Sequence, residues 1–218
     1  MEIEDGVSSW DIHPKVVLMD YHRWQLNRYS HTGEANGFST KLMIMTDHTG
    51  THVDSQTHFF PEGNSIDQFP LGKFVGEAIL LDVSNRNIDE PIRSSDLNRA
   101  LTNTEEDIKH EDIIIIKAWP FDRTHPKFSS SPGFTSEAVD WLLNKKIKIL
   151  ATDLATVDFQ DSSRPAHVKL LKENVLIMEN LVNLNRIEQN RFSFIGLPLR
   201  LKEGTGSPIR AIALMDKI

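Results

Sequence analysis

Apolar residues occur along the chain in short runs, and several of these runs lack the alternation with polar residues that a half-exposed strand shows. The run of four isoleucines from Ile113 to Ile116 is the clearest case. Uninterrupted runs of this kind are typical of strands buried on both faces of a sheet. The pattern predicts six strands, at residues 41–46, 78–83, 113–117, 147–152, 175–179 and 209–215.

The strongest helical pattern lies at residues 136–145. Ala138, Trp141 and Leu142 fall on one face at helical spacing. Thr135 precedes them, and a threonine at this position can accept a hydrogen bond from the first turn. Two shorter helices are predicted, one at 95–101 with Ser94 or Ser95 as its cap and one at 165–172 with Pro165 in its first turn.

The order of the predicted elements indicates the fold class. Between residues 113 and 152 the chain forms a strand, a long loop, a helix and a second strand, an order that usually joins two parallel strands. With 218 residues, the chain has the size of one domain with a substantial core. We therefore expect a single α/β domain over residues 1–218 that contains mixed sheets.

Composition and charge narrow the range of functions. The formal net charge of -7 opposes binding to nucleic acid or anionic membranes, which attract clustered Lys and Arg. The longest aliphatic run is far too short to cross a bilayer, and the acidic start MEIED is unlike a signal peptide. We therefore expect a cytoplasmic protein without nucleic-acid or membrane partners. The sequence has no cysteine, so any metal must be held by nitrogen and oxygen ligands.

Potential metal ligands gather in the stretch HTGTHVDSQTHFF, which begins at His48. His48, His52, Asp54 and His58 are separated by even numbers of residues and would share one face of an extended strand. Ten residues of strand cover about 33 Å, however, far more than one metal centre. The chain must therefore bend, and Gly50 permits the bend. His52 and Asp54 would then lie close enough to share an ion, and one helical turn would bring His58 alongside.

Each of these side chains also has a simpler interpretation when taken alone. Histidines at strand ends are often structural or surface residues, and Asp54 could cap a helix that begins near Ser55. A metal site explains all four side chains together, which separate structural roles do not. Imidazole and carboxylate ligands suit zinc, manganese or iron(II).

The same stretch, HTGTHVD followed after three residues by HF, resembles the signature of the metal-dependent cyclase family, which includes bacterial kynurenine formamidases and isatin hydrolases. The resemblance continues through SPGFTSEAVDWLLNKKIKILATDLATVD (131–158), RPAHVKLLKENVLIMENLVNL (164–184) and GSPIRAIAL (206–214). It covers the chain from about residue 41 to the C-terminus. It implies a single domain of the swivelling β/β/α type, the putative cyclase fold.

The resemblance implies a role for each residue of the signature. In family members with two metal ions, the matching positions make His48, His52 and Asp54 ligands of the first ion. Asp54 would also bridge to the second ion. The last signature histidine, His58, would be the catalytic proton donor and acceptor.

A later segment would complete the site. By the resemblance, His167 binds the second ion, and Glu179, twelve positions further on, binds both. The pattern predicts a helix at 165–172 and a buried strand at 175–178, an arrangement that could return Glu179 near His167. An unpaired carboxylate at the end of an apolar run is costly to bury, and a metal ion would remove that cost. Taken singly, Glu179 could instead face water, and His167 could simply begin a helix.

The resemblance implies a metal-dependent amide hydrolase, in which a metal-activated water attacks the carbonyl and His58 moves the proton. The leading expectation is an arylformamidase that converts N-formylkynurenine to kynurenine and formate, a step of tryptophan catabolism. The alternatives are hydrolysis of another cyclic amide or a lactone, a metal-dependent cyclase or lyase, and a non-catalytic protein with a structural metal. The family also implies one or two zinc or manganese ions per chain, a small aromatic or cyclic amide as substrate, and a homodimer or homotetramer.

The sequence departs from the family pattern where the substrate would be selected. Residues 19–39 lack the family's proline–glycine turn, and Trp24 is the nearest counterpart of a tryptophan that packs on the substrate ring in kynurenine formamidases. Gln56 replaces the usual proline of the signature. Trp24, Gln56 and Phe60 are therefore the candidate substrate contacts, and Trp119 is expected in the core. The remaining histidines are expected at the surface: His13, His22, His31, His110 and His125.

Overall fold

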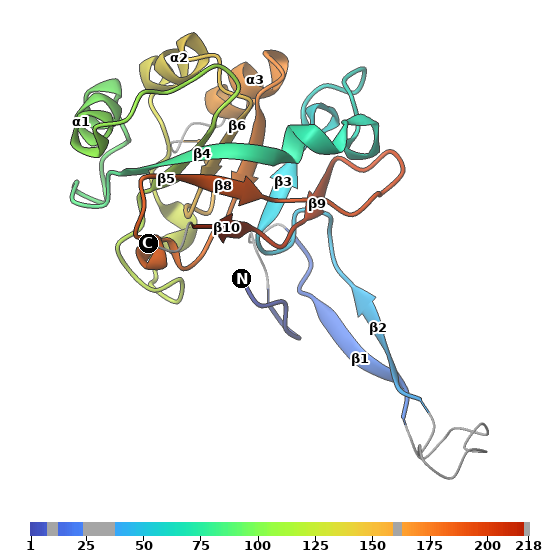
Figure 1. Ribbon diagram of the computed structural model, residues 1–218. Helices are drawn as coiled ribbons and strands as arrows, with labels where there is room; N and C mark the ends of the chain where they lie inside the picture. The colour runs from blue at the N-terminus through green and yellow to red at the C-terminus, as the bar shows by residue number, and fades with distance from the viewer. Residues whose placement is uncertain (8–12, 24–37, 159–162, 216–218) are drawn as a thin grey trace.

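A computed structural model of the protein describes residues 1–7, 13–23, 38–158 and 163–215 (Figure 1). Within these residues, the main element is a curved, mixed sheet of eight strands, and three α-helices cover one of its faces. The helices are α1 (Ser94–Thr104), α2 (Ser136–Asn144) and α3 (Pro165–Lys172). The strands are β1 (Val17–His22), β2 (Thr40–Ile44), β3 (His52–Asp54), β4 (Val75–Asp82), β5 (Ile113–Lys117), β6 (Ile149–Thr152), β7 (Leu176–Glu179), β8 (Arg191–Ile195), β9 (Gly206–Pro208) and β10 (Ile212–Leu214).

The strand order in the main sheet is β10-β8-β4-β5-β6-β7-β3-β9. The central strands β4, β5, β6 and β7 run parallel, and the strands on either side run antiparallel to their neighbours. β5 and β6 pair in parallel, as the sequence predicted, and α2 lies in the connection between them. A parallel pair needs such a crossover over the face of the sheet. The expected α/β class with a mixed sheet is confirmed.

The central strands are buried on both faces. Ile114 and Ile116 pack among the side chains of the three helices, whereas Ile113 and Ile115 pack on the opposite face of the sheet. All four are fully buried. Cover on both faces explains why this run shows no alternation with polar residues.

The predicted helices are present, with one difference at a helix start. α2 begins after Thr135, as predicted, and α3 has the predicted bounds. The cap residue of α1 is Arg93, however, rather than Ser94 or Ser95. The backbone N–H of Arg93 donates to the Asp96 carboxylate at 3.0 Å. The acidic side chain of the first turn therefore accepts the backbone N–H at this helix start, and no serine hydroxyl acts as the cap.

The apolar run at 41–46 does not form a strand of the main sheet. Its strand, β2, pairs with β1, and together they form a separate antiparallel ribbon that projects from the body of the protein (Figure 1). Every residue of β2 is exposed. An apolar run therefore predicts a strand correctly here but does not show what packs against it.

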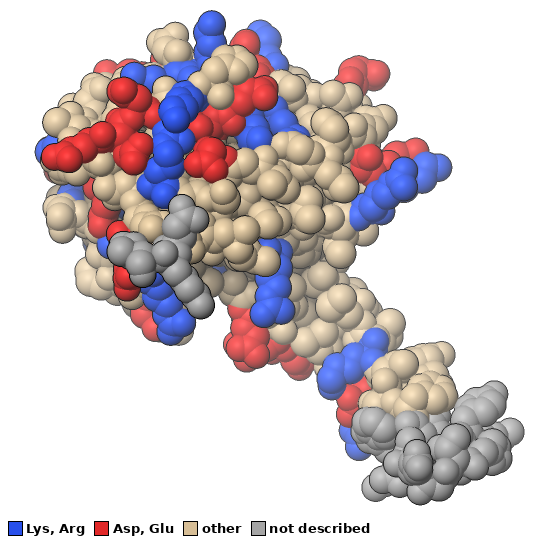
Figure 2. Space-filling view, in the orientation of Figure 1, with Lys and Arg blue, Asp and Glu red and all other residues tan. Residues whose placement is uncertain are grey.

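Charged side chains are interspersed over the surface. On the face shown in Figure 2, Lys and Arg lie among Asp and Glu rather than in a basic patch. Among the described residues, no helix has the length and apolar character that a membrane span requires.

Asp153 follows β6 and makes a pH-dependent contribution to the stability of the fold. Its Oδ1 accepts hydrogen bonds from the backbone N–H groups of Ala118 and Trp119, at 2.8 and 3.1 Å. Burial raises the pKa of Asp153 from 3.8 to about 7. The folded protein therefore holds this proton more tightly than the unfolded chain. The stability that results is fully present below about pH 4 and is lost as the pH rises through about 7.

Asp153→Asn is expected to remove this loss of stability. The asparagine keeps an oxygen that can accept both N–H groups but does not ionise. Between about pH 5 and pH 8, the free energy of unfolding of the wild type should fall relative to that of the variant by roughly 2–3 kcal/mol. Urea unfolding of the two metal-free proteins measures the difference. If the free energies of unfolding of the two proteins changed in parallel with pH, the raised pKa of Asp153 would be wrong.

Candidate active site and metal centre

The signature segment enters the site through β3, which lies between β7 and β9. Gly50 has a φ of +70°, a left-handed conformation that glycine adopts without strain, and it turns the chain between His48 and β3. His52 and Asp54 are the first and last residues of β3. His52 is paired with Glu179 of β7 across the sheet. The bend and the strand pairing therefore gather these side chains in one place.

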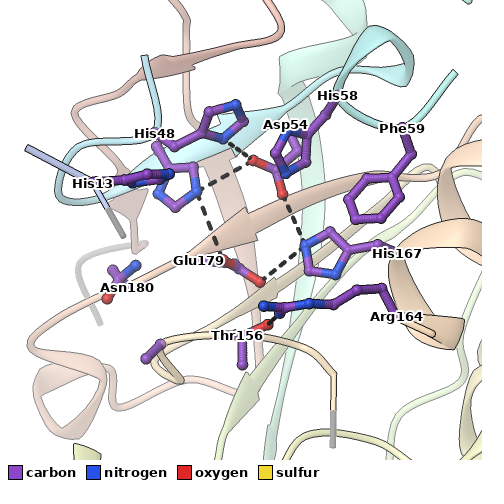
Figure 3. A pocket seen from close by; sticks show the side chains of 12 residues that line it. His13, His48, Asp54, His58, Phe59, Thr156, Arg164, His167, Glu179 and Asn180 are labelled. Carbon is purple, nitrogen blue, oxygen red and sulfur yellow. Dashed lines mark hydrogen bonds and ion pairs between the residues drawn. The ribbon is translucent and has the colours of Figure 1, made fainter. Parts of the chain in front are cut away.

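Asp54 lies at the centre of the cluster (Figure 3). Its Oδ1 is 2.7 Å from His48 Nδ1 and 3.2 Å from His52 Nε2. Its Oδ2 is 3.4 Å from His167 Nε2, and this atom is buried without a hydrogen bond. A buried carboxylate oxygen that lacks a hydrogen bond is costly. A cation at this position would remove that cost.

Hydrogen bonds fix the orientation of His52. Its Nδ1 donates to the Gly50 carbonyl at 2.9 Å, which leaves Nε2 facing Asp54 and Glu179 at 3.2 and 3.6 Å. Glu179 is itself held by the Val157 N–H, which donates to its Oε1 at 2.8 Å. An imidazole fixed in this way presents the Nε2 lone pair to the cluster, as metal-binding histidines do.

Asp158 orients His167, a role that the sequence did not reveal. One oxygen of Asp158 accepts a short hydrogen bond from His167 Nδ1, and its Oδ1 accepts another from the Ala166 N–H in the first turn of α3, at 2.7 Å. Nε2 of His167 then faces Asp54 and Glu179 at 3.4 and 3.5 Å. Carboxylate–histidine pairs of this kind orient ligand histidines at metal sites.

The loop that carries Asp158 passes very close to Gly133. A Cβ atom at Gly133 would lie 2.0 Å from the Val157 carbonyl oxygen, so only glycine fits. The next residue, Phe134, donates its N–H to the same carbonyl at 2.8 Å. The Pro-Gly element and the final aspartate of TDLATVD were both part of the family resemblance. Together they were the signal from which Asp158 could have been found.

Asp158→Asn is expected to weaken metal binding by about 10- to 100-fold. The asparagine can still accept a hydrogen bond but carries no charge to hold the His167 imidazole in its orientation. Competition with a coloured chelator measures the affinity. Asp140→Asn, at an exposed position of α2, is the matched control and should leave the affinity unchanged. Equal affinities for wild type and Asp158→Asn would contradict the orienting role.

His58 lies beside the cluster rather than at its centre. It ends a short 3-10 helix, Gln56–His58, and its ring centroid is 4.0 Å from that of His48. Burial lowers the pKa of His58 to about 4, although the nearby Asp54 carboxylate opposes the shift. A histidine that is neutral near pH 7 can accept a proton during catalysis.

The pKa values of two buried histidines of the cluster, His52 and His167, are shifted in the opposite direction. Burial opposes the charged form of His52, but Asp54 outweighs it and raises the pKa to about 9. Burial also opposes the charged form of His167, yet its hydrogen bond to Asp158 and the nearby charges of Asp54 and Glu179 raise the pKa to about 10. Burial would raise the pKa of Asp54, but His52 and His48 hold it well below its usual range. A divalent cation would displace the protons of these acid–base pairs.

The donor set fits a divalent metal ion. Two groups of side chains have ligand atoms that all lie within 4.8 Å of one another. They are His48, Asp54 and His58, and His52, Asp54 and Glu179. Nitrogen and carboxylate donors in such numbers suit zinc or manganese. The buried Asp54 Oδ2 that lacks a hydrogen bond supports the same conclusion.

A cavity of about 230 Å³ opens onto the cluster (Figure 3). Phe59 forms part of its wall, and the Phe59 ring stacks on His167 with 5.0 Å between centroids. Arg164 and Asn180 contribute polar side chains to the lining. The cavity therefore joins the cluster to a mixed aromatic and polar wall that could hold a small molecule.

The structure places the expected substrate contacts away from this wall or outside the described residues. Gln56 and Phe60 are not among the described residues that line the cavity. Gln56 donates its amide N–H to the Leu171 carbonyl at 2.9 Å and so holds its loop against α3. Phe60 packs on the core beneath the helices, and its neighbour Phe59 faces the cavity instead. Trp24 lies outside the described residues.

His13 was expected at the surface, but it lines the cavity. Its ring centroid is 6.2 Å from that of His48, a contact between distant segments that no local pattern indicates. Trp119 lies in the core, as expected, and packs on Phe128 with 5.5 Å between centroids. Of the other histidines, His110 is exposed, His22 and His125 are half-buried, and His31 lies outside the described residues.

Known proteins resemble this chain over most of its length. A kynurenine formamidase of Bacillus cereus is 29% identical over 181 residues, which is 82% of this chain and 81% of that protein. Isatin hydrolase of Roseibium aggregatum is 27% identical over 203 residues, with 83% of this chain and 76% of that protein covered. The structure of a predicted metal-dependent hydrolase from Bacillus stearothermophilus shares the fold, with a TM-score of 0.75 at 22% identity over 98% of this chain and 94% of that one.

These similarities agree with the interpretation of the sequence. They confirm the expected fold and the expected class of enzyme, a hydrolase of carbon–nitrogen bonds. The family model described as "Putative cyclase" matches residues 1–159, so the similarity begins upstream of the region in which the motifs were recognised. The chain belongs to the putative cyclase family.

Proposed function

We propose that this protein hydrolyses a small aryl formamide to formate and an aryl amine, with the help of one or two divalent metal ions. One observation carries the proposal: the buried Asp54 Oδ2 lacks a hydrogen bond and lies among histidines and Glu179 at the wall of a cavity. The similarity to a kynurenine formamidase of Bacillus cereus supports the formamide as the substrate class.

The proposed metal ligands come from three elements of the chain. His48 and His52 would bind one ion and His167 the other, and Asp54 and Glu179 would bind both. The ions, zinc or manganese, would supply an activated water and polarise the amide carbonyl. The Nδ1 atoms of His52 and His167 donate hydrogen bonds to the Gly50 carbonyl and to Asp158, which keeps both Nε2 atoms directed at the carboxylates.

His58 is the proposed proton carrier. In the hydrolysis, a bond forms between the water oxygen and the carbonyl carbon, the carbon–nitrogen bond breaks, and one proton passes from the water to the departing nitrogen. His58 borders the cavity, and its pKa, lowered to about 4, leaves it neutral near pH 7. It can therefore take the proton from the water and return it to the leaving amine.

The size of the cavity favours a substrate with about one ring. Its volume of about 230 Å³ is below the range of roughly 300–1,000 Å³ that is usual for pockets of drug-sized ligands. Phe59 offers an aromatic wall on which a ring could pack. The similarity to isatin hydrolase supports a second candidate, the ring opening of a cyclic aromatic amide. A lyase or cyclisation reaction would differ from both, because no oxygen from isotope-labelled water would enter its product.

A homo-oligomer, either a dimer or a tetramer, is also part of the proposal. In the ribbon, Val17 pairs with Ile44 and Met19 pairs with Leu42, and all four apolar side chains are exposed. A two-stranded ribbon is marginally stable without cover on one face. A second copy of the chain would provide that cover. Sedimentation of the purified protein as a monomer would contradict this part of the proposal.

The test combines metal content with formate release from formanilide. We expect one or two divalent ions per chain, and formate release that a chelator abolishes and added zinc or manganese restores. Bound metal without hydrolysis of formanilide or isatin would reject the proposed reaction but keep the metal site. A protein that binds neither zinc nor manganese after reconstitution would reject the metal site as well.

A further inference from the structure

Asn180 is a buried side chain of the cavity wall that the proposed reaction does not use. It follows Glu179 at the end of β7 and is 1% exposed. Its φ of 60° is left-handed, a conformation in which asparagine is enriched. This conformation breaks the alternation of side chains along the strand. Glu179 and Asn180 therefore both line the cavity.

Arg123 fixes the direction of the Asn180 amide. Its Nη2 donates a hydrogen bond to Asn180 Oδ1 at 2.9 Å. A guanidinium has only donors, so Asn180 must present its oxygen to Arg123 and its nitrogen away from it. Figure 3 shows the amide nitrogen directed toward His13 and the cluster. This nitrogen, Nδ2, is buried and has no hydrogen-bond partner.

Arg123 has an unused donor of its own. Its Nη1 is buried without a hydrogen-bond partner, and its guanidinium lies over the Phe128 ring at 4.8 Å from the centroid. Within the described part of the chain, the hydrogen-bond partner of Arg123 is the neutral amide of Asn180 rather than a carboxylate. Two buried donors, one of them on a permanent cation, are costly unless a ligand accepts from them.

A carboxylate on a bound ligand would provide both an acceptor for Asn180 Nδ2 and a negative charge near Arg123. It accepts several hydrogen bonds, so it can take the N–H of Asn180 Nδ2. It is also negatively charged, so it offsets the nearby Arg123. Among the described residues Arg123 forms no ion pair, so a neutral ring substituent would leave its charge without a counter-ion from that part of the chain.

We propose that Asn180, held in place by Arg123, binds a carboxylate substituent of the substrate, so that the preferred amides are anionic. The inference rests on the proposed hydrolase function and deepens it, since the metal cluster acts on the amide while Asn180 binds a second group of the same molecule. Asn180 determines specificity by direct contact. Arg123 is a positioning residue that acts through Asn180.

The test compares two substrates with the metal-loaded enzyme: formanilide, which is neutral, and 3-formamidobenzoate, which carries a carboxylate. The wild type should have the higher kcat/KM with 3-formamidobenzoate. Asn180→Asp keeps the size of the side chain and tolerates the left-handed φ, but it presents a second negative charge. It should raise the KM for 3-formamidobenzoate by about 10- to 100-fold relative to any change that it causes in the KM for formanilide.

Variants of Arg123 separate positioning from a general structural role. Arg123→Gln should raise the KM for 3-formamidobenzoate with little change in kcat, and Arg123→Lys should restore part of the loss. The effects of Asn180→Asp and Arg123→Gln should not add, because both act on one contact. Arg99→Gln, at an exposed position of α1, is the matched control for loss of a positive charge. It should leave kcat and KM unchanged for both substrates.

Three outcomes would overturn the inference while the hydrolase function stands. The first is a wild type with equal kcat/KM for the two substrates. The second is an Asn180→Asp variant that loses the same fraction of kcat/KM with both. The third is inhibition by the product formate that weakens in Asn180→Asp while the KM for 3-formamidobenzoate stays constant. The third outcome would show that Asn180 and Arg123 bind the released formate rather than a carboxylate of the substrate.

Failure of the hydrolase function has its own signature, because the metal-loaded wild type would then hydrolyse neither substrate. In that case, calorimetric measurement of benzoate binding tests the carboxylate site without requiring hydrolysis. The wild type should bind benzoate at least about tenfold more tightly than Asn180→Asp. Equal affinities would overturn the inference.

Discussion

Replacing His58 with glutamine is expected to lower kcat for formamide hydrolysis by about 100- to 10,000-fold while the protein keeps its metal. His58 borders the cavity, with its ring centroid 4.0 Å from that of His48. Burial lowers its pKa to about 4, so the imidazole is neutral near pH 7 and can take a proton. Glutamine fills a similar space but cannot accept and return a proton. Formate release and metal content should be measured on the same sample.

The metal content decides between the two roles that the geometry allows for His58. His58 forms, with His48 and Asp54, one of the two groups whose ligand atoms lie within 4.8 Å of one another. Loss of an ion together with activity in His58→Gln would make His58 a ligand and contradict the role of proton carrier. His110→Gln changes an exposed histidine and should affect neither activity nor metal content.

The local part of the site could be predicted from the sequence because its geometry is set within a few residues. Gly50 provides the bend, and His52 and Asp54 lie two positions apart on β3. The spacing of these residues therefore indicated which side chains would meet. The stretch alone could not exclude structural roles for them, and the family resemblance was needed for that.

The distant part of the site depends on how strands pair, which spacing does not reveal. The helix α3 and the strand β7 were predicted, but their pattern does not show that His167 and Glu179 face Asp54. The pairing of β3 with β7 places Glu179 opposite His52, and the hydrogen bond to Asp158 orients His167 toward the same cluster. β3 and β9 contain three residues each, too few for a periodic signal. Their position at this edge of the sheet was therefore not predicted.

The residues missed by the sequence interpretation act through contacts between distant segments. The family resemblance included Asp158, but its orienting role is visible only in the hydrogen bond that it accepts from His167 Nδ1. His13 is recognisable only because it lines the cavity. Asn180 and Arg123 were missed for a related reason, since a donor without a partner becomes visible only when all neighbours are known. Polar residues in loops carry no periodic pattern from which such contacts could be inferred.

Asp54→Asn is expected to have the largest effect on metal binding, a loss of more than about 100-fold in affinity, because it removes the charge of a proposed shared ligand. The two oxygens of Asp54 face His48, His52 and His167 at 2.7, 3.2 and 3.4 Å. Competition with a chelator measures the affinity, and hydrolysis should fall with it. Asp47→Asn is the matched control from the same segment, since Asp47 is 28% exposed and 3.8 Å from His48 Nε2. If Asp47→Asn and Asp54→Asn weakened binding equally, a general loss of negative charge would explain the result better than loss of a ligand.

The same substitution also tests the electrostatics of the metal-free cluster. Burial opposes the charged forms of His52 and His167, but partners that include Asp54 raise their pKa values to about 9 and about 10. Their charged forms therefore add stability that is fully present below the unfolded pKa of 6.5 and is lost as the pH rises through about 9 to 10. Metal-free Asp54→Asn should lose stability relative to the wild type most strongly below about pH 6.5, because it removes the counter-ion of two buried imidazolium groups. The difference, measured by urea unfolding, should shrink toward about pH 10, where the wild-type imidazoles become neutral. A difference that grew with pH would show that these histidines are neutral in the metal-free protein and that Asp54 does not hold their protons.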